Sequence, residues 1–215
     1  MMIFGPVSYL PGKGMMSRFQ SLEFAALVAS GAGAAGAGHP FMCNGACLAY
    51  RKSAFLEVKG FEGNEKYLSG DDVFLLHKMK KTFGRKSVVF ARAEEAMAMT
   101  SPEAGLIAFI RQRMRWASKS RGYRDPVAAF TAISVFSFNL LLAATFIAGI
   151  FHPPFFLLFA GFLLFKSVTD LPLVTGIARF TRAVHLLYWY LPFQVLYPFY
   201  TALAGIFSMF GRRKW

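Results

Sequence analysis

The pattern of hydrophobic and polar positions divides the chain into two parts. From Val127 to Phe165 the sequence has no Asp, Glu, Lys or Arg. Three apolar segments in this half, Val127–Phe151, Phe155–Gly176 and Val184–Phe210, predict about three membrane helices, because a helical span needs roughly 20 apolar residues. Before residue 127, shorter apolar runs alternate with charged residues, which predicts a water-facing part.

The water-facing part predicts short strands and helices in alternation. Residues 1–7 and 86–92 read as strands, 41–50 as a strand or hairpin, and 14–30, 51–61 and 69–84 as helices. The last of these helices begins with Ser69 or Asp71 as its cap and ends at Gly84. The run "GAGAAGAG" predicts a flexible or close-packed loop. Its Gly-x-Gly-x-x-Gly spacing does not indicate a dinucleotide site, because it follows a helix instead of a strand.

Residues 105–120 predict an amphipathic helix just before the first span. At about 100° per residue, one side carries Gln112, Arg115, Trp116 and Lys119, and the opposite side carries Leu106, Ile107, Ile110, Met114 and Ala117. This pattern is typical of a helix lying in the membrane interface. Its polar side indicates either an Arg/Trp anchor at the lipid headgroups or a site for an anionic substrate, because arginine suits phosphate oxygens.

Composition and charge narrow the class of partner. Apolar residues make up 55% of the chain, the mean hydropathy is +0.42 and the formal net charge is +13. A strongly basic chain favours an anionic partner such as a nucleotide-sugar or a phospholipid surface. We expect no nucleic-acid partner, because the basic residues gather beside the membrane flank and no binding module is recognisable. The same flank predicts a cytoplasmic water-facing part.

Three further features are candidates for chemistry. Asp71 and Asp72 follow each other at a helix start, where they act either as dipole-stabilising residues or, for one of them, as a general base. Lys166 and Asp170 lie one helical turn apart and predict an ion pair, structural or on a transport pathway. The two cysteines, in "CNGAC", predict reduced thiols and no metal site.

The chain resembles the C-terminal half of a processive-type family 2 glycosyltransferase. That group includes the membrane-bound cellulose, chitin and hyaluronan synthases. The resemblance depends on three motifs in this order, followed by apolar spans: "CNGACLAYRKSAF", "SGDD" and "RQRMRW". The resemblance implies an α/β fold: a partial GT-A-like domain at residues 1–102, an interfacial amphipathic helix and linker at 103–126, and an α-helical transmembrane region at 127–215. It also implies inverting sugar transfer at the cytoplasmic face of a bacterial-type inner or plasma membrane.

The resemblance assigns roles residue by residue. It makes Asp72 the catalytic base with Asp71 as its neighbour, and it places Gln112 and Arg115 on the leaving diphosphate. The remaining matches line the acceptor site: Trp116, Cys43, Asn44 and Gly45. The implied partners are a nucleotide-sugar donor, a carbohydrate or lipid acceptor and membrane lipids.

The resemblance also implies a divalent cation, Mg²⁺ or Mn²⁺, whose ligands we expect outside this chain. No Asp-x-Asp motif occurs in the sequence, so we expect the donor-binding half to be absent from this chain, as in a truncated gene, a split gene or a fragment. One alternative is a non-catalytic membrane-anchored fragment or subunit that needs a separate chain to supply the donor-binding half. The other is a small transporter subunit that uses Lys166 and Asp170.

Overall fold

The computed structural model describes residues 1–64, 69–119, 122–123 and 125–210. In chain order its elements are β1 Met2–Phe4, β2 Val7–Tyr9, α1 Met15–Gly36, β3 Leu48–Tyr50, α2 Lys52–Glu57, α3 Asp71–Phe83, η1 Arg85–Ser87, β4 Val88–Phe90, η2 Glu94–Ala96, β5 Ala98–Thr100, α4 Leu106–Lys119, α5 Pro126–Phe151, α6 Phe155–Phe180, η4 Val184–Trp189 and α7 Tyr190–Phe210. Helices and strands mix in the first half and only helices follow, so the predicted combination of an α/β part and an α-helical part is confirmed.

The strands form two small sheets. β1 is the central strand of one sheet, antiparallel to β3 and parallel to β4, and β2 pairs in parallel with β5. One face of the larger sheet packs on α3 through a buried cluster: Met2, Phe4, Leu75, Leu76, Met79 and Val88. The alternation of buried and exposed positions in β1, with Ile3 turned outward, is what a period of two residues dictates.

The Gly/Ala run is helical, which corrects the loop that its composition predicted. α1 continues without a break to Gly36. Glycine is a poor helix former, by about 1 kcal/mol relative to alanine, so packing must stabilise the helix here. A side chain at Gly31 would press against Met42, and one at Gly33 would lie 3.8 Å from Leu173 of α6. The predicted close packing is therefore present, but the packed segment is a helix and not a loop.

The helix predicted at residues 69–84 is present as α3, although it begins differently. Gly70 is its N-cap, in the left-handed region at φ 99°, and no side chain caps the helix. Neither Ser69 nor Asp71 is the cap, because the turn into the helix needs a positive φ that glycine adopts without strain. The two aspartates of the first turn still lie where the helix dipole favours negative charge.

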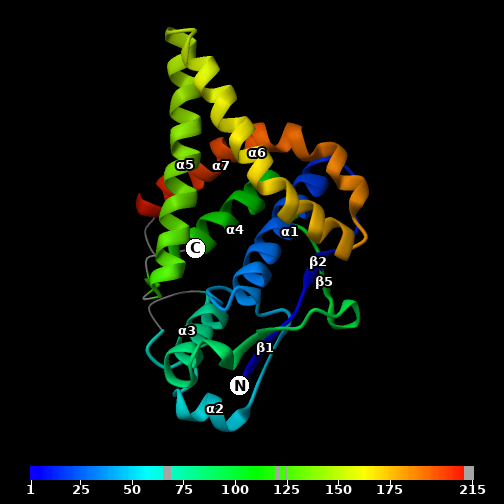
Figure 1. The fold of residues 1–215 in the computed structure, drawn as a ribbon, viewed down its shortest axis with the longest axis vertical. Coiled ribbons are helices and arrows are strands. Elements are labelled where there is room, and N and C mark those ends of the chain that lie inside the picture. Colours follow the sequence, from blue (N-terminus) through cyan, green and yellow to red (C-terminus); the bar gives the residue numbers. More distant parts are fainter. Residues whose placement is uncertain (65–68, 120–121, 124, 211–215) are drawn as a thin grey trace.

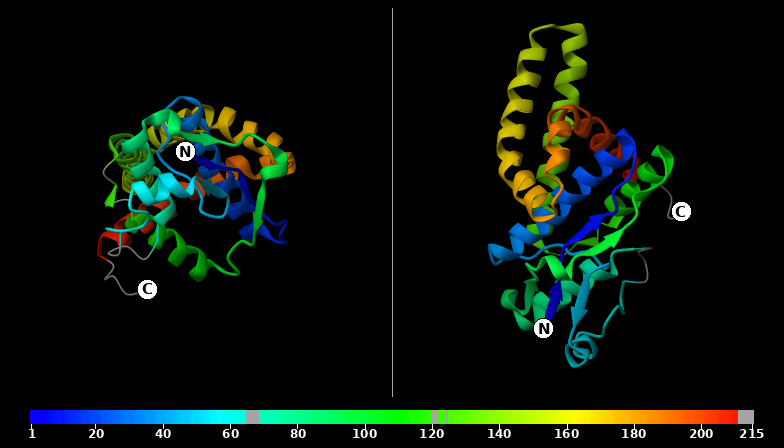
Figure 2. Two further views of the ribbon diagram at one scale, coloured as in Figure 1. Left: turned by 90° about the horizontal axis from the view of Figure 1, so that it is seen from below. Right: turned by 90° about the vertical axis from the view of Figure 1, so that its right-hand side faces the viewer.

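Two helices of the described chain, α5 and α6, are long and apolar enough to cross a membrane. They form a long hairpin whose turn projects away from the strands (Figures 1 and 2). α5 begins where the Asp125 carboxylate accepts hydrogen bonds from the Val127 and Ala128 amides, with Pro126 in its first turn. The third predicted span corresponds to η4 and α7, and α7 crosses α5 partway along the hairpin in Figure 1; that it crosses a membrane stays a prediction.

The two parts of the molecule share one core. Apolar side chains of α1, α4, α6, η4 and α7 pack together: Phe19, Leu22, Phe109, Val174, Leu186, Tyr190 and Phe193. A salt bridge adds a second link, since Lys80 of α3 lies 2.5 Å from Asp125 at the start of α5. The water-facing elements and the hairpin are therefore fixed to each other by both apolar packing and charge.

Candidate functional site

The Asp72 carboxylate lies at the start of α3 and is oriented by two backbone amides. Its Oδ2 accepts a hydrogen bond from the Gly45 amide at 2.8 Å, and its Oδ1 accepts one from the Val73 amide at 2.9 Å. Asp71, its neighbour, points to solvent. The consecutive aspartates thus have different environments, as the 100° step of a helix requires.

The segment facing Asp72 is a tight turn. Asn44 Oδ1 accepts a hydrogen bond from the Ala46 amide at 3.0 Å, an Asx-type contact that holds the turn and presents the Gly45 amide to Asp72. Cys43 precedes the turn, and burial, with the nearby Asp72 charge, raises the pKa of its thiol well above the usual value. Cys43 and Cys47 are both free thiols.

A cavity of about 1190 Å³ extends from this turn to α5, α6 and α7. Four of the residues to which the resemblance assigned a role line it: Cys43, Asn44, Asp72 and Trp116. The same cavity is lined by polar and apolar residues of α5, α6 and α7. Asp71, Gly45, Gln112 and Arg115 are not part of its wall, although the Gly45 amide donates a hydrogen bond to the Asp72 carboxylate.

Arg113 is the functional-site residue that the sequence analysis missed. It is 5% exposed and forms a buried ion pair with Glu23 of α1. Its guanidinium lies 4.3 Å from the ring centroid of Trp116 and 4.5 Å from that of Phe109. Tyr200 of α7 donates a hydrogen bond to the same Glu23 at 2.7 Å. Arg113 therefore ties the Trp116 ring to α1 and α7.

The sequence did contain a signal for this pair. Arg113 lies three residues after Ile110 and four after Phe109, so on a helix it falls on the apolar side. Glu23 likewise follows Phe19 by four residues on the apolar side of α1. A charge on a face that will be buried requires an opposite charge beside it, so the two together predict a pair.

The two residues assigned to the diphosphate lie apart from the cavity wall. Gln112 donates a hydrogen bond to the Glu103 carboxylate at 2.6 Å and accepts one from Arg113. Arg115 is exposed to solvent. Lys119, one helical turn further, lies beside Gly70 and lines the cavity near Asp72. Lys119, at the end of α4, is thus a cation that lines the cavity together with Asp72.

Comparison with known families decides the class of protein. The profile of glycosyl transferase family 21 matches residues 2–208. The chain belongs to glycosyl transferase family 21. The prediction of a glycosyltransferase is thereby confirmed, while the kinship with family 2 and the assignment to a C-terminal half stay predictions. No curated protein and no solved structure matches the chain.

For this family 21 chain the implied divalent cation stays a prediction. No group of three or more His, Cys, Asp or Glu side chains comes together in the part of the chain that the structure describes. Mg²⁺ is often held by one or two carboxylates together with substrate phosphates and waters, so this finding does not test the prediction. We therefore derive no step through a metal ion.

The arrangement supports one kind of chemistry in this family 21 member. A carboxylate that opens onto a cavity can accept a proton from a hydroxyl. The Tyr123 ring lies beside Asp72 and contacts the His77 ring. Burial, together with the Asp72 charge, raises the pKa of the Tyr123 phenol, so this side chain stays neutral. Asp72 is thus the carboxylate of α3 that faces the cavity.

Proposed function

We propose that this family 21 chain forms the acceptor side of an inverting glycosyltransferase at the cytoplasmic face of a membrane, with Asp72 as the general base. One observation carries the proposal: Asp72 and Trp116 line the same cavity as residues of α5, α6 and α7. The water-facing elements then represent part of a GT-A-like domain. The exposed Leu106 (60%) and Ile107 (69%) of α4 support its place at the membrane interface.

The reaction is a single displacement. As the acceptor hydroxyl oxygen attacks the anomeric carbon of the donor sugar, its proton moves to the Asp72 carboxylate. The bond from that carbon to the diphosphate breaks, and the electron pair leaves with the nucleoside diphosphate. Attack from the side opposite the leaving group inverts the anomeric configuration. The Gly45 amide keeps one Asp72 oxygen fixed, which orients the other.

The leaving diphosphate and the acceptor need different surroundings. Gln112 and Arg115 are the residues proposed for the diphosphate, and the solvent-exposed guanidinium of Arg115 is free to reach a nucleotide that arrives from water. Trp116 offers a flat ring at the cavity wall, on which the acceptor lies. Because Arg113 holds that ring, we assign Arg113 as a positioning residue.

The cavity favours a lipid acceptor over a carbohydrate one. Its wall beyond Trp116 consists largely of apolar side chains of the membrane helices, among them Phe138, Leu173 and Phe193. A polysaccharide would leave its many hydroxyls unpaired against such a wall. A lipid alcohol can place its chains among these residues and its hydroxyl near Asp72.

The test is sugar transfer by the chain purified from its own membranes, together with whatever remains bound to it. With radiolabelled nucleotide-sugars and Mg²⁺ or Mn²⁺, we expect label to pass into lipid that an organic solvent extracts. The product should carry the anomeric configuration opposite to that of the donor. Label found only in water-soluble polymer, or retention of configuration, contradicts the proposal.

A non-catalytic membrane subunit is the second candidate, favoured by one observation. The sequence has no Asp-x-Asp motif and the described residues hold no metal cluster, so we expect the donor site on a separate chain. If transfer occurs only in preparations that contain a second protein, and Asp72→Asn leaves the rate unchanged, this chain acts as an anchor. If Asp72→Asn abolishes transfer, it supplies the catalytic base.

A further inference from the structure

The first turns of α1 meet the short helix η4, which follows α6 in the chain. The Arg18 guanidinium lies 5.2 Å from the centroid of the Trp189 ring, and Met16 and Trp189 pack against the same buried cluster. Figure 1 shows the start of α1, in dark blue, beside η4, in orange. Residues 13–18 and 179–191 thus form one surface region, the basic rim.

The basic rim has positive charge and no acidic residue. The sequence contains no Asp or Glu in residues 1–22 or in residues 171–215. The exposed cations of the rim are Lys13, Arg18, Arg179 and Arg182. Of these, only Arg182 forms an ion pair with a described residue, the exposed Glu94. An anionic surface is therefore the complementary partner of the rim.

The uncharged side chains at the surface of the rim are apolar or aromatic. Tyr188 is 89% exposed and Met15 is 59% exposed, and Val184 and Leu191 are exposed as well. Exposed apolar side chains beside Trp, Tyr and Arg are typical of a membrane interface, where the aromatic rings lie among the headgroups. This mixture favours a lipid surface over a soluble anion, which would leave the apolar side chains in water.

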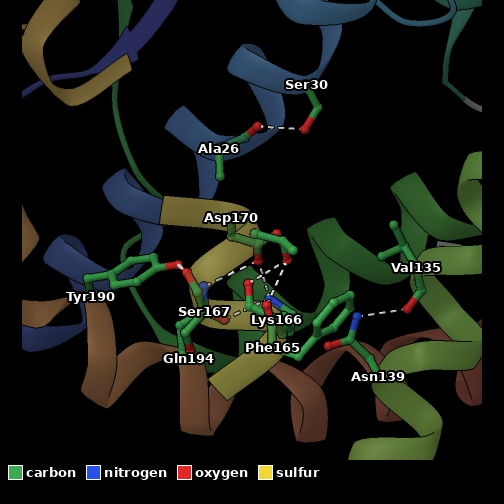
Figure 3. A network of polar contacts seen from close by, with 11 residues as sticks. Ala26, Ser30, Val135, Asn139, Phe165, Lys166, Ser167, Asp170, Tyr190 and Gln194 are labelled. Atoms are coloured by element: carbon green, nitrogen blue, oxygen red, sulfur yellow. Dashed lines mark hydrogen bonds and ion pairs between the residues drawn. The ribbon is translucent and has the colours of Figure 1, made fainter. Parts of the chain in front are cut away.

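Contacts with α6 set the depth of the rim in the membrane. From the start of α5 onward, Lys166 is the first charged residue of the hairpin. Tyr190, directly after η4, donates a hydrogen bond to the Ser167 carbonyl at 2.7 Å, and Gln194 donates one to Asp170 at 3.3 Å. Figure 3 shows both side chains reaching the part of α6 that begins at Lys166. Because charges belong near the edge of the hydrocarbon layer, the rim lies at the headgroups on the side of the strands.

We propose that the basic rim binds the headgroups of anionic phospholipids in the leaflet on the side of the strands. In the proposed orientation this is the cytoplasmic leaflet, which is the one that carries anionic lipids. Arginine side chains pair with the lipid phosphates, and the Trp189 and Tyr188 rings lie among the headgroups. Neither Arg18 nor Trp189 lines the cavity, so these lipids are distinct from the acceptor. The inference goes beyond the proposed function and does not depend on Asp72.

The test counts lipids bound to the full chain in detergent micelles by native mass spectrometry. Two probes with the same acyl chains are titrated separately: dioleoyl phosphatidylglycerol, which is anionic, and dioleoyl phosphatidylcholine, which has no net charge. We expect phosphatidylglycerol to bind at least about tenfold more tightly, since each cation beside an anionic surface contributes about fivefold. A higher ionic strength should narrow this ratio, because exposed charges are screened.

Three variants place the preference at the rim. Arg18→Gln should lower the ratio of the two affinities about fivefold, whereas Arg18→Lys, which keeps the charge, should retain most of it. Arg51→Gln is the matched control. Arg51 is an exposed arginine directly before α2, and α2 lies at the opposite end of the molecule from the hairpin turn (Figure 1). This control removes the same charge from the chain and should keep the ratio.

Equal affinity of the unaltered chain for the two lipids would overturn the inference, and this comparison needs no variant. A ratio that falls equally in folded Arg18→Gln and Arg51→Gln would overturn it as well, because the preference would then follow the net charge of the chain alone. A protein partner on the rim would give a second chain in the spectra of the unaltered protein that is lost in Arg18→Gln. That result, with equal binding of the two lipids, assigns the rim to a protein and rejects the lipid.

Discussion

Arg113 of α4 and Glu23 of α1, 90 residues apart in sequence, form a buried ion pair in which Arg113 Nε lies 3.0 Å from Glu23 Oε1. The pair joins three helices, because Tyr200 of α7 donates to the same carboxylate. It also holds the Trp116 ring at the cavity wall. The geometry of the proposed acceptor site thus depends on a buried ion pair in its own wall.

The first prediction concerns this pair. Arg113→Met or Glu23→Leu alone leaves an uncompensated buried charge, which typically costs about 3–5 kcal/mol. The double variant removes both charges and should recover most of that loss. The measurement is a double-mutant cycle on the midpoint of thermal unfolding in detergent. Losses that simply add in the double variant would show that the two side chains do not interact.

The second prediction concerns the start of α3. Gly70 has φ 99°, and a Cβ there would lie 2.6 Å from Lys119 Cδ. Gly70→Ala should therefore destabilise the chain by about 1 kcal/mol or more through backbone strain and should displace Lys119. Gly105→Ala is the control, since a Cβ at Gly105 meets no atom within 4 Å and no positive φ is present there. Equal unfolding midpoints for the two variants would contradict the prediction that Gly70→Ala strains the backbone.

The third prediction is a pH dependence that arises at His77. Burial lowers the pKa of His77, although the Phe41 carbonyl and Asp125 act in the opposite direction and Lys80 adds to the lowering. The unfolded chain, with a histidine pKa of about 6.5, then binds the proton more readily than the folded chain. Above about pH 6.5, the pKa in the unfolded chain, the contribution of His77 to the free energy of unfolding is complete. It is lost as the pH falls through the lower pKa of the folded chain.

Thermal unfolding between pH 5 and 7.5 measures this effect. The unfolding midpoint should fall on acidification below about pH 6.5, and His77→Gln, which keeps a donor toward Phe41, should flatten the slope. Asp125 does not contribute in this range, because its hydrogen bond and ion pair with Lys80 hold its pKa below the usual value despite burial. The same slope in both proteins would assign the pH dependence to other groups.

Local signals in the sequence predicted most of the elements. The α3 helix between an acidic first turn and Gly84, the β4 strand and the Lys166–Asp170 pair are all present, because each depends on residues close together in the chain. The error at the Gly/Ala run has a tertiary cause. Glycine weakens a helix locally, and only the packing of α1 on α6 decides the outcome.

The site was harder to predict, since its parts come from distant segments. The motifs indicated Asp72 and Trp116 separately, but that both line one cavity depends on how α3 and α4 pack. The helical wheel placed Gln112, Arg115 and Trp116 on one side. In the structure Trp116 lines the cavity with Arg113, while Gln112 binds Glu103 and Arg115 faces solvent. A wheel shows which residues share a side, but the partner helix decides which side is buried.

The fourth prediction tests the central claim, that Asp72 is the base of a site opening toward the membrane helices. In the preparation that transfers sugar, Asp72→Asn should lower the transfer rate by at least about 10²-fold, the usual value of a general base. Asp71→Asn should have a smaller effect, because Asp71 lies outside the cavity wall. Glu57→Gln, which neutralises an exposed carboxylate on α2, should leave the rate unchanged.

The most direct measurement is therefore the initial rate of sugar transfer by Asp72→Asn relative to Glu57→Gln, with equal amounts of folded protein judged by circular dichroism and gel filtration. We predict a rate at least about 10²-fold lower for Asp72→Asn. Equal rates for these two variants would contradict the account and leave the cavity without its catalytic carboxylate.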